Sequence, residues 1–140
     1  MKRKTLFFLF SCSTVFAFAA NTFVTTHGDD AQDGTSWESS MSSIQAAIDA
    51  SSSGDTVFIA EGTYNQSVKL KDGVHILGGY DPSTGKRDYE TFPTVLDGTN
   101  LGKALISQGS AFKVPTYCDG LILQNAAHSN NRGAAVLKAN

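Results

Sequence analysis

Cysteine is scarce in this sequence, which contains only Cys12 and Cys118. Cys12 lies in an N-terminal segment that has the features of an export signal, so removal of that segment leaves Cys118 without a partner for an internal disulfide. A small domain held together by internal disulfides is therefore excluded. We expect Cys118 to be a small buried apolar residue, and a reactive thiol is the alternative.

The sequence also lacks an apolar run long enough to cross a bilayer. Its longest run, residues 6–20, covers about 15 residues, whereas a transmembrane helix needs roughly 20. Three basic residues precede this run, and a small-x-small motif at residues 17–19 ends it, which is typical of a cleaved signal peptide. We therefore predict a signal peptide over residues 1–19, export of the chain and no membrane span. A retained anchor and lipidation at Cys12 are the alternatives.

An excess of positive charge is absent as well. Once residues 1–19 are removed, 8 Lys and Arg stand against 13 Asp and Glu, which gives a net charge of −5. An acidic surface argues against nucleic acid or an anionic membrane as a partner.

What the sequence does contain is a series of short β-rich runs bounded by turn residues, typical of strands that need neighbours for stability. The phrase Asp72-Gly73-Val74 returns as Asp119-Gly120-Leu121, 47 residues further on. This spacing is consistent with repeated strand–turn units. We expect one apolar residue from each unit to point into a common interior: Val57, Val74, Val95 and Leu121. The predicted strands cover residues 56–60, 67–70, 74–77, 94–98, 104–107 and 121–125, with a first edge strand at residues 23–26 and a further strand beginning at residues 134–139.

One helix is predicted over residues 42–51. Ile44, Ala47 and Ile48 fall on one face of it at helical spacing. A serine at 39, 40 or 42 is expected to cap its N-terminus. The helix is predicted to cover an open end of the stacked strands, and a partner-binding amphipathic helix is the alternative.

These phrases carry a resemblance. GDTVFIAEGTY, KDGVHILGGYD and PTVLDG together resemble the opening of right-handed parallel β-helix proteins of the pectin-lyase-like superfamily, and most resemble bacterial adhesin-like or polymorphic outer-membrane β-helix proteins. The resemblance implies an all-β right-handed parallel β-helix, a single-stranded solenoid of about three coils, in which residues 20–53 hold the N-terminal loop and capping helix and residues 54–140 form the first, incomplete coils. We therefore expect further coils beyond residue 140.

The resemblance also implies a function. The adhesin-like β-helix proteins that the chain most resembles imply a secreted or surface-exposed module of a Gram-negative bacterium, at the outer-membrane or extracellular surface. They imply a structural, adhesin-like or glycan-contacting role and no catalysis in this chain. The expected partner is a polysaccharide or a host or cell-surface glycan. The alternative is the N-terminal part of a polysaccharide lyase or glycoside hydrolase that acts on uronate-rich glycans, with its active site further along. No catalytic residues are predicted, because four candidate aspartates each precede glycine and are expected to be turn residues: Asp33, Asp72, Asp97 and Asp119.

The best candidate for ligand contact is an excursion over residues 80–93, where turn residues are followed by charges and aromatics. Aromatic faces stack on sugar rings and charged groups bind sugar hydroxyls, so this composition suits a glycan; a solvated loop that only packs on the strands is the alternative. The candidate ligand-binding residues are Tyr80, Lys86, Arg87, Asp88 and Tyr89.

A second candidate is a calcium site in the loop over residues 27–34. Asp29, Asp30 and Asp33 lie at spacings that superficially resemble a calcium loop. Ala31 occupies the middle ligand position and Ser40 stands where a bidentate glutamate is needed. A solvated turn and a loosely held calcium ion therefore both remain open. No other cofactor is expected, since His27, His75 and His128 are widely dispersed. Trp37 is expected to pack on the core or its cap.

Overall fold

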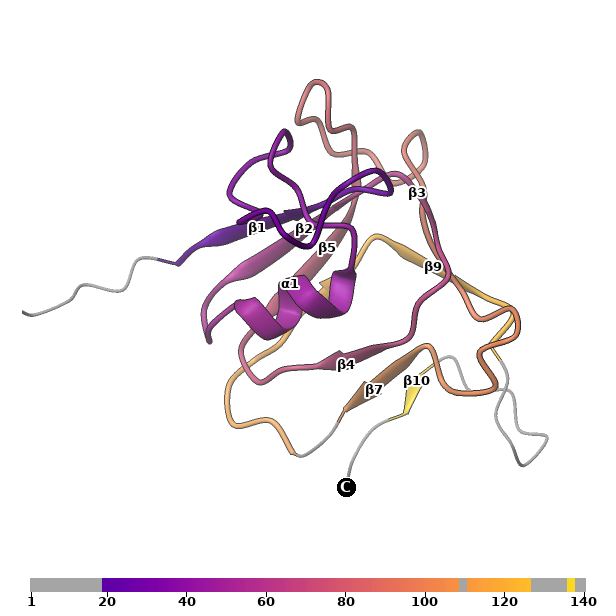
Figure 1. Ribbon diagram of the computed structural model, residues 1–140. Coiled ribbons are helices and arrows are strands. Elements are labelled where there is room, and N and C mark those ends of the chain that lie inside the picture. The colour runs from indigo at the N-terminus through magenta and orange to yellow at the C-terminus, as the bar shows by residue number, and fades with distance from the viewer. Residues whose placement is uncertain (1–18, 109–110, 127–135, 138–140) are drawn as a thin grey trace, which may run out of the picture.

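A computed structural model of the chain describes residues 19–108, 111–126 and 136–137 (Figure 1). Ten strands and one helix are present in this part of the chain. In chain order they are β1 (Asn21–Val24), α1 (Ile44–Ala50), β2 (Thr56–Ala60), β3 (Gly62–Tyr64), β4 (Val68–Leu70), β5 (His75–Tyr80), β6 (Thr94–Asp97), β7 (Ile106–Gln108), β8 (Cys118–Asp119), β9 (Leu121–Gln124) and β10 (Val136–Leu137).

The strands form three small sheets. Their orders are β1-β2-β5-β8, β10-β7-β4 and β3-β6-β9, and every pairing within them is parallel. From β2 onward, neighbours within a sheet are separated along the sequence by strands of the other two sheets. Parallel neighbours require such long connections, and here the connections carry the loops that surround the candidate site.

The predicted fold class, an all-β right-handed parallel β-helix solenoid, is wrong. The structure contains several short parallel strands in three small sheets together with a helix, no solenoid or right-handed β-helix is identified in it, and strands account for only 34% of the residues. The physical reason lies in the strands, which are two to six residues long, and in the turns and loops that occupy most of the remaining chain. The parallel strands that the resemblance implies are present, but the fold class that it implies is not.

Helix α1 contributes to the core. Its apolar face, Ile44, Ala47 and Ile48, is buried, and the helix contacts β1, β2 and β4. The prediction of a helix in this region is confirmed, although the N-cap is Ser43, whose hydroxyl accepts a hydrogen bond from the Ala46 amide at 3.2 Å. The cap therefore lies one residue beyond the predicted serines.

Of the four residues predicted to point into the core, one does not. Val57 and Val74 are buried and Leu121 packs partly against the core, as expected. Val95, however, is only half-buried, because Thr94 and Leu96 on either side of it point inward. Val95 pairs with Thr63 and Ile122 on the outer side of the sheet.

A buried threonine fixes the start and the end of the excursion. The Thr94 hydroxyl is fully buried, donates to the Ala60 carbonyl at 3.0 Å and accepts from the Gly79 amide at 2.9 Å. A buried hydroxyl without such partners is costly, so these bonds satisfy the group and join β2, β5 and β6. The excursion consequently leaves and re-enters the sheets at a rigid point.

Candidate functional site

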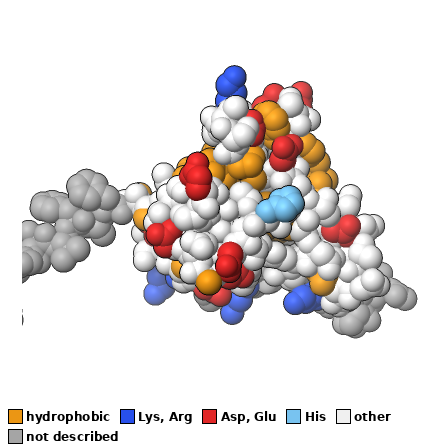
Figure 2. All heavy atoms as spheres, turned by 45° about the horizontal axis from the view of Figure 1, so that its top comes forward, with side chains coloured by type: hydrophobic (Ala, Val, Ile, Leu, Met, Phe, Trp, Pro, Cys, Tyr) orange, Lys and Arg blue, Asp and Glu red, His pale blue; other side chains and the backbone are white. Residues whose placement is uncertain are grey.

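The excursion is a structured loop that projects from the sheets at the top of Figure 1. Tyr80 and Arg87 form an antiparallel bridge, and the Asp81 amide donates to the Lys86 carbonyl at 2.9 Å. The Asp81 carboxylate accepts hydrogen bonds from Ser83 and from the Thr84 hydroxyl, which lower its pKa and close the turn. Figure 2 shows apolar side chains gathered near the projecting loop, with a basic side chain at its tip and acidic side chains beside them.

Arg87 holds this loop against β8. Its Nε donates to the Gly78 carbonyl at 2.9 Å, its Nη2 lies 2.6 Å from Asp119 Oδ2, and its guanidinium carbon lies 5.8 Å from the centre of the Tyr80 ring. The hydrogen bond and the charge of Arg87 lower the pKa of Asp119. Arg87 is therefore already committed to intramolecular partners, and Asp119 stays ionised near neutral pH.

The backbone beneath Arg87 is packed too closely for side chains. A Cβ at Gly78 would lie 2.3 Å from the Gly120 carbonyl oxygen, and Gly120 itself has a φ of +70°. Only glycine fits such an approach. The two glycines thus bring the start of β9 beneath the excursion.

Four aromatic rings stack beside the loop. Phe23 lies 4.7 Å from Trp37 and 5.4 Å from Phe58 between ring centres, and Tyr80 lies 5.0 Å from Phe58 and 5.7 Å from Trp37. These rings cover the face of β2 on which Phe58 lies, opposite the buried Val57 and Ile59. Tyr80 and Trp37 are consequently held in place by their neighbours.

The structure separates the five predicted ligand-binding residues. Tyr80 belongs to the aromatic stack and Arg87 to the contact with Asp119. The Asp88 carboxylate accepts hydrogen bonds from the Thr91 hydroxyl and amide and from the Glu90 amide, so it closes a turn and its pKa is lowered. Lys86 and Tyr89 are exposed, and Tyr89 is 55% accessible.

Tyr89 lines a groove that sequence reasoning did not identify. The groove has a volume of about 580 Å³ and lies between the excursion and the start of β9. Ile122, which is 47% exposed, supplies a second apolar surface, while Glu90 and Asp119 supply carboxylates. We call it the Tyr89 groove. It is lined by Tyr89, Glu90, Pro93, Asp119, Gly120, Leu121 and Ile122.

Each of the three candidate calcium ligands accepts hydrogen bonds from other groups of the protein, Asp29 and Asp33 within their own loop and Asp30 from the residues that precede α1. Asp29 Oδ1 accepts from the Ala31 amide at 2.9 Å, and Asp33 Oδ1 accepts from the amide and hydroxyl of Thr35 and from the Ser39 hydroxyl. Asp30 Oδ1 accepts from the amides of Ser42 and Ser43, just before α1, and from the Ser42 hydroxyl. Within the described residues no three His, Cys, Asp or Glu side chains form a group able to hold a metal ion.

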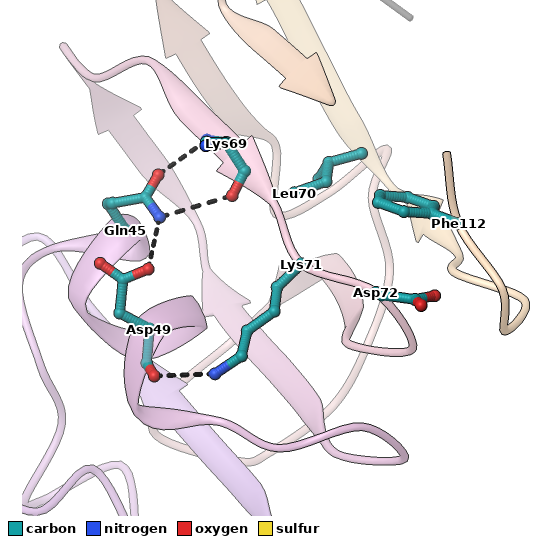
Figure 3. Close-up of a pocket in the computed structure, with 7 residues that line it drawn as sticks. All are labelled: Gln45, Asp49, Lys69, Leu70, Lys71, Asp72 and Phe112. Carbon is teal, nitrogen blue, oxygen red and sulfur yellow. Dashed lines mark hydrogen bonds between the residues drawn. The ribbon is translucent and has the colours of Figure 1, made fainter. Parts of the chain in front are cut away.

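A further hollow, of about 330 Å³, lies where α1 meets β4 (Figure 3). Gln45 accepts from the Lys69 amide at 2.7 Å and donates to Asp49 Oδ1 at 2.9 Å. The Lys71 ammonium donates to the carbonyls of Asp49 and Ser51 at the end of α1. These polar groups bind one another, so their hydrogen bonds connect α1 to β4 and leave few free groups in the hollow.

Among the described residues, no carboxyl group has a clearly raised pKa, as a general acid at neutral pH would need. Every carboxyl group of the described residues that has a clearly shifted pKa is shifted downward, which favours the ionised form. His75 lies at the outer side of β5 and accepts a hydrogen bond from the Tyr117 amide at 3.2 Å.

Cys118 differs from its prediction. The residue is exposed and free, so it is not a buried apolar residue. Neighbouring atoms nevertheless desolvate the thiol and, together with the charge of Asp119, raise the pKa of Cys118 to about 11. A thiolate is therefore scarce at neutral pH, which disfavours the alternative of a reactive thiol.

Comparison with known proteins returned no matching family model, no matching curated protein and no matching solved structure. The resemblance to pectin-lyase-like proteins stays a prediction without support from these comparisons. None of the helices in the described part of the chain is long and apolar enough to span a membrane.

Proposed function

We propose that this chain is a secreted or surface-exposed module that contacts a glycan through the Tyr89 groove, in a structural or adhesin-like role. The observation that carries the proposal is an exposed aromatic ring beside carboxylates in one groove: Tyr89 is 55% exposed, and Glu90 and Asp119 line the same groove. The basic and apolar N-terminal segment supports export.

A sugar suits this groove better than other ligands. The CH face of a pyranose ring packs on an aromatic ring, while carboxylates accept hydrogen bonds from sugar hydroxyls. The Asp119 carboxylate is held in position by Arg87 at 2.6 Å, so it is oriented before a ligand arrives. The net charge of −5 after removal of residues 1–19 opposes nucleic acid as the ligand.

Catalysis is not part of the proposal. Hydrolysis of a glycosidic bond requires two suitably spaced carboxyl groups that flank it, and no observation on the described residues identifies such a pair. The alternative of a polysaccharide lyase or hydrolase stays a prediction that no observation favours.

Binding to a panel of immobilised oligosaccharides tests the proposal. We expect the purified full chain to bind at least one sugar, and Tyr89→Ala to weaken that binding roughly tenfold through loss of ring stacking. Tyr117→Ala is the matched control, because Tyr117 is 62% exposed and lies outside the groove. Equal effects of the two substitutions, or no binding to any sugar, would contradict the proposal.

A further inference from the structure

A second groove is lined by Trp37, which contacts the same Tyr80 ring that Arg87 contacts. Trp37 lies 5.7 Å from Tyr80, Tyr80 lies 5.8 Å from the Arg87 guanidinium, and Arg87 contacts Asp119 of the Tyr89 groove. The second groove has a volume of about 380 Å³ and is bounded by the loops of residues 25–40 and by Pro82 of the excursion. The excursion therefore contributes three residues to the Tyr89 groove and one, Pro82, to the second groove.

The wall of this groove, which we call the Trp37 groove, is aromatic and fixed. Trp37 is half-buried, with Phe23 at 4.7 Å and Tyr80 at 5.7 Å between ring centres. The expectation that Trp37 packs on the core or its cap accounts for these contacts but not for its place in a groove. A ring that is already immobilised loses little conformational entropy when a ligand packs on it.

The remaining lining is polar and predominantly acidic. Asp29 and Glu38 contribute carboxylates and Gln32 an amide, whereas His27 is the only basic side chain among the lining residues. Hydrogen bonds from its own amide and from the Ser36 hydroxyl lower the pKa of Glu38, so this carboxyl is ionised near neutral pH.

Both grooves therefore repel anions. The Tyr89 groove contains Glu90 and Asp119, and among the described residues Arg87 lies beside it, where it is paired with Asp119 and leaves the charge of Glu90 uncompensated. An ammonium group, by contrast, is attracted by the carboxylates and by the face of an indole ring. A sugar that carries free amino groups can bind the polar groups of both grooves, pack on their aromatic rings and match their negative charge. A uronate carries a negative charge and therefore does not match it.

We propose that the Trp37 groove is a second sugar subsite and that the ligand is an oligosaccharide of amino sugars rather than of uronic acids. This inference rests on the proposed function, because it adds a subsite and a ligand class to the same excursion. The proposed ligand also differs from the uronate-rich glycan that the alternative of a polysaccharide lyase or hydrolase implies.

Fluorescence reports on the second groove directly, because Trp37 is the only tryptophan of the chain. We expect a glucosamine tetrasaccharide to change the Trp37 emission in a saturable manner, its N-acetylated counterpart to do so more weakly, and a galacturonate tetrasaccharide to leave the emission unchanged. Glu38→Gln keeps the size of the side chain and removes its charge. It should weaken glucosamine binding roughly two- to fivefold, as expected for an exposed ion pair, without affecting the N-acetylated sugar.

Calorimetry on the same samples separates this inference from the proposed function. If glucosamine binding depends on Tyr89 but leaves the Trp37 emission unchanged, the second subsite is wrong while the proposed function stands. If the galacturonate binds as tightly as the glucosamine, the ligand class is wrong. If none of these three sugars binds while another sugar of the panel does, the ligand class is wrong and the proposed function stands; if no sugar of the panel binds, both proposals fail.

Discussion

The side-chain amide of Gln45 binds the backbone of Lys69 in both directions. Its oxygen accepts from the Lys69 amide at 2.7 Å and its nitrogen lies 3.4 Å from the Lys69 carbonyl, so the helix side chain occupies the edge of β4 as a neighbouring strand would. Gln66 makes the reverse connection, because its amide accepts from the Ile44 amide and donates to the Ser42 carbonyl at the start of α1. The two glutamines protect a sheet edge and a helix end at the same time.

We expect Gln45→Ala to lower the free energy of unfolding by about 1 kcal/mol, since it leaves the Lys69 amide and carbonyl without protein partners. Urea denaturation of the full chain measures the change. Gln32→Ala is a suitable control, because Gln32 is exposed and should change the stability by less than about 0.5 kcal/mol. Equal stabilities of the two variants would show that the connection between α1 and β4 does not contribute.

Thr94→Val tests the buried hydroxyl. The valine fills the same volume but leaves the Gly79 amide without its acceptor, so we expect a loss of about 1–3 kcal/mol in the free energy of unfolding. Thr63→Val is the matched control, because Thr63 is exposed on the neighbouring strand β3. If both valines leave the urea midpoint unchanged, the hydroxyl is dispensable.

Some elements of the fold could be predicted from the sequence and others could not. Residues 56–60, 94–97 and 121–124 are strands and residues 44–50 a helix, because apolar spacing and bounding turn residues set them locally. β3 and β8 were missed, since strands of three and two residues carry too little periodicity. Thr94 points inward instead of Val95 because its hydroxyl finds buried partners, a tertiary effect that hydrophobic pattern does not capture.

In the candidate site, too, some residues could be predicted from the sequence and others could not. Tyr89 was recognisable from its place in a charged and aromatic excursion, but Ile122 joins its groove only through the close approach of Gly78 to Gly120. Asp30 suggested calcium because it sits among other aspartates, whereas in the fold its oxygen binds the amides that precede α1. Contacts between distant segments decide such roles, and a single sequence does not reveal them.

Arg87→Met should loosen the excursion without unfolding the protein. The pair with Asp119 is partly exposed and is worth less than about 1 kcal/mol globally, but Arg87 also binds the Gly78 carbonyl. We expect faster hydrogen exchange at the Asp88 amide, which donates to the Gly79 carbonyl at 2.8 Å, and little change in the core strands. Lys86→Met provides the control, because Lys86 is exposed; similar exchange in both variants would argue against Arg87 as the residue that holds the loop.

Asp97 should make stability dependent on acid pH. Its carboxylate accepts from the Thr99 hydroxyl and amide and from the Asn125 amide group, and these bonds lower its pKa well below the ordinary value of 3.8. Because the folded-state pKa is the lower one, the stabilisation is present above pH 3.8 and is lost as the pH falls through the folded-state pKa.

Asp97→Asn isolates this contribution from the other carboxyl groups with lowered pKa values. We expect the wild-type protein to exceed the variant in thermal midpoint at neutral pH, and the difference to shrink as the pH falls below 3.8, because protonated Asp97 and asparagine are then both uncharged. Thermal unfolding of the two proteins across the acid range measures the difference. Curves that stay parallel down to the lowest pH would show that Asp97 gains nothing from these bonds on folding.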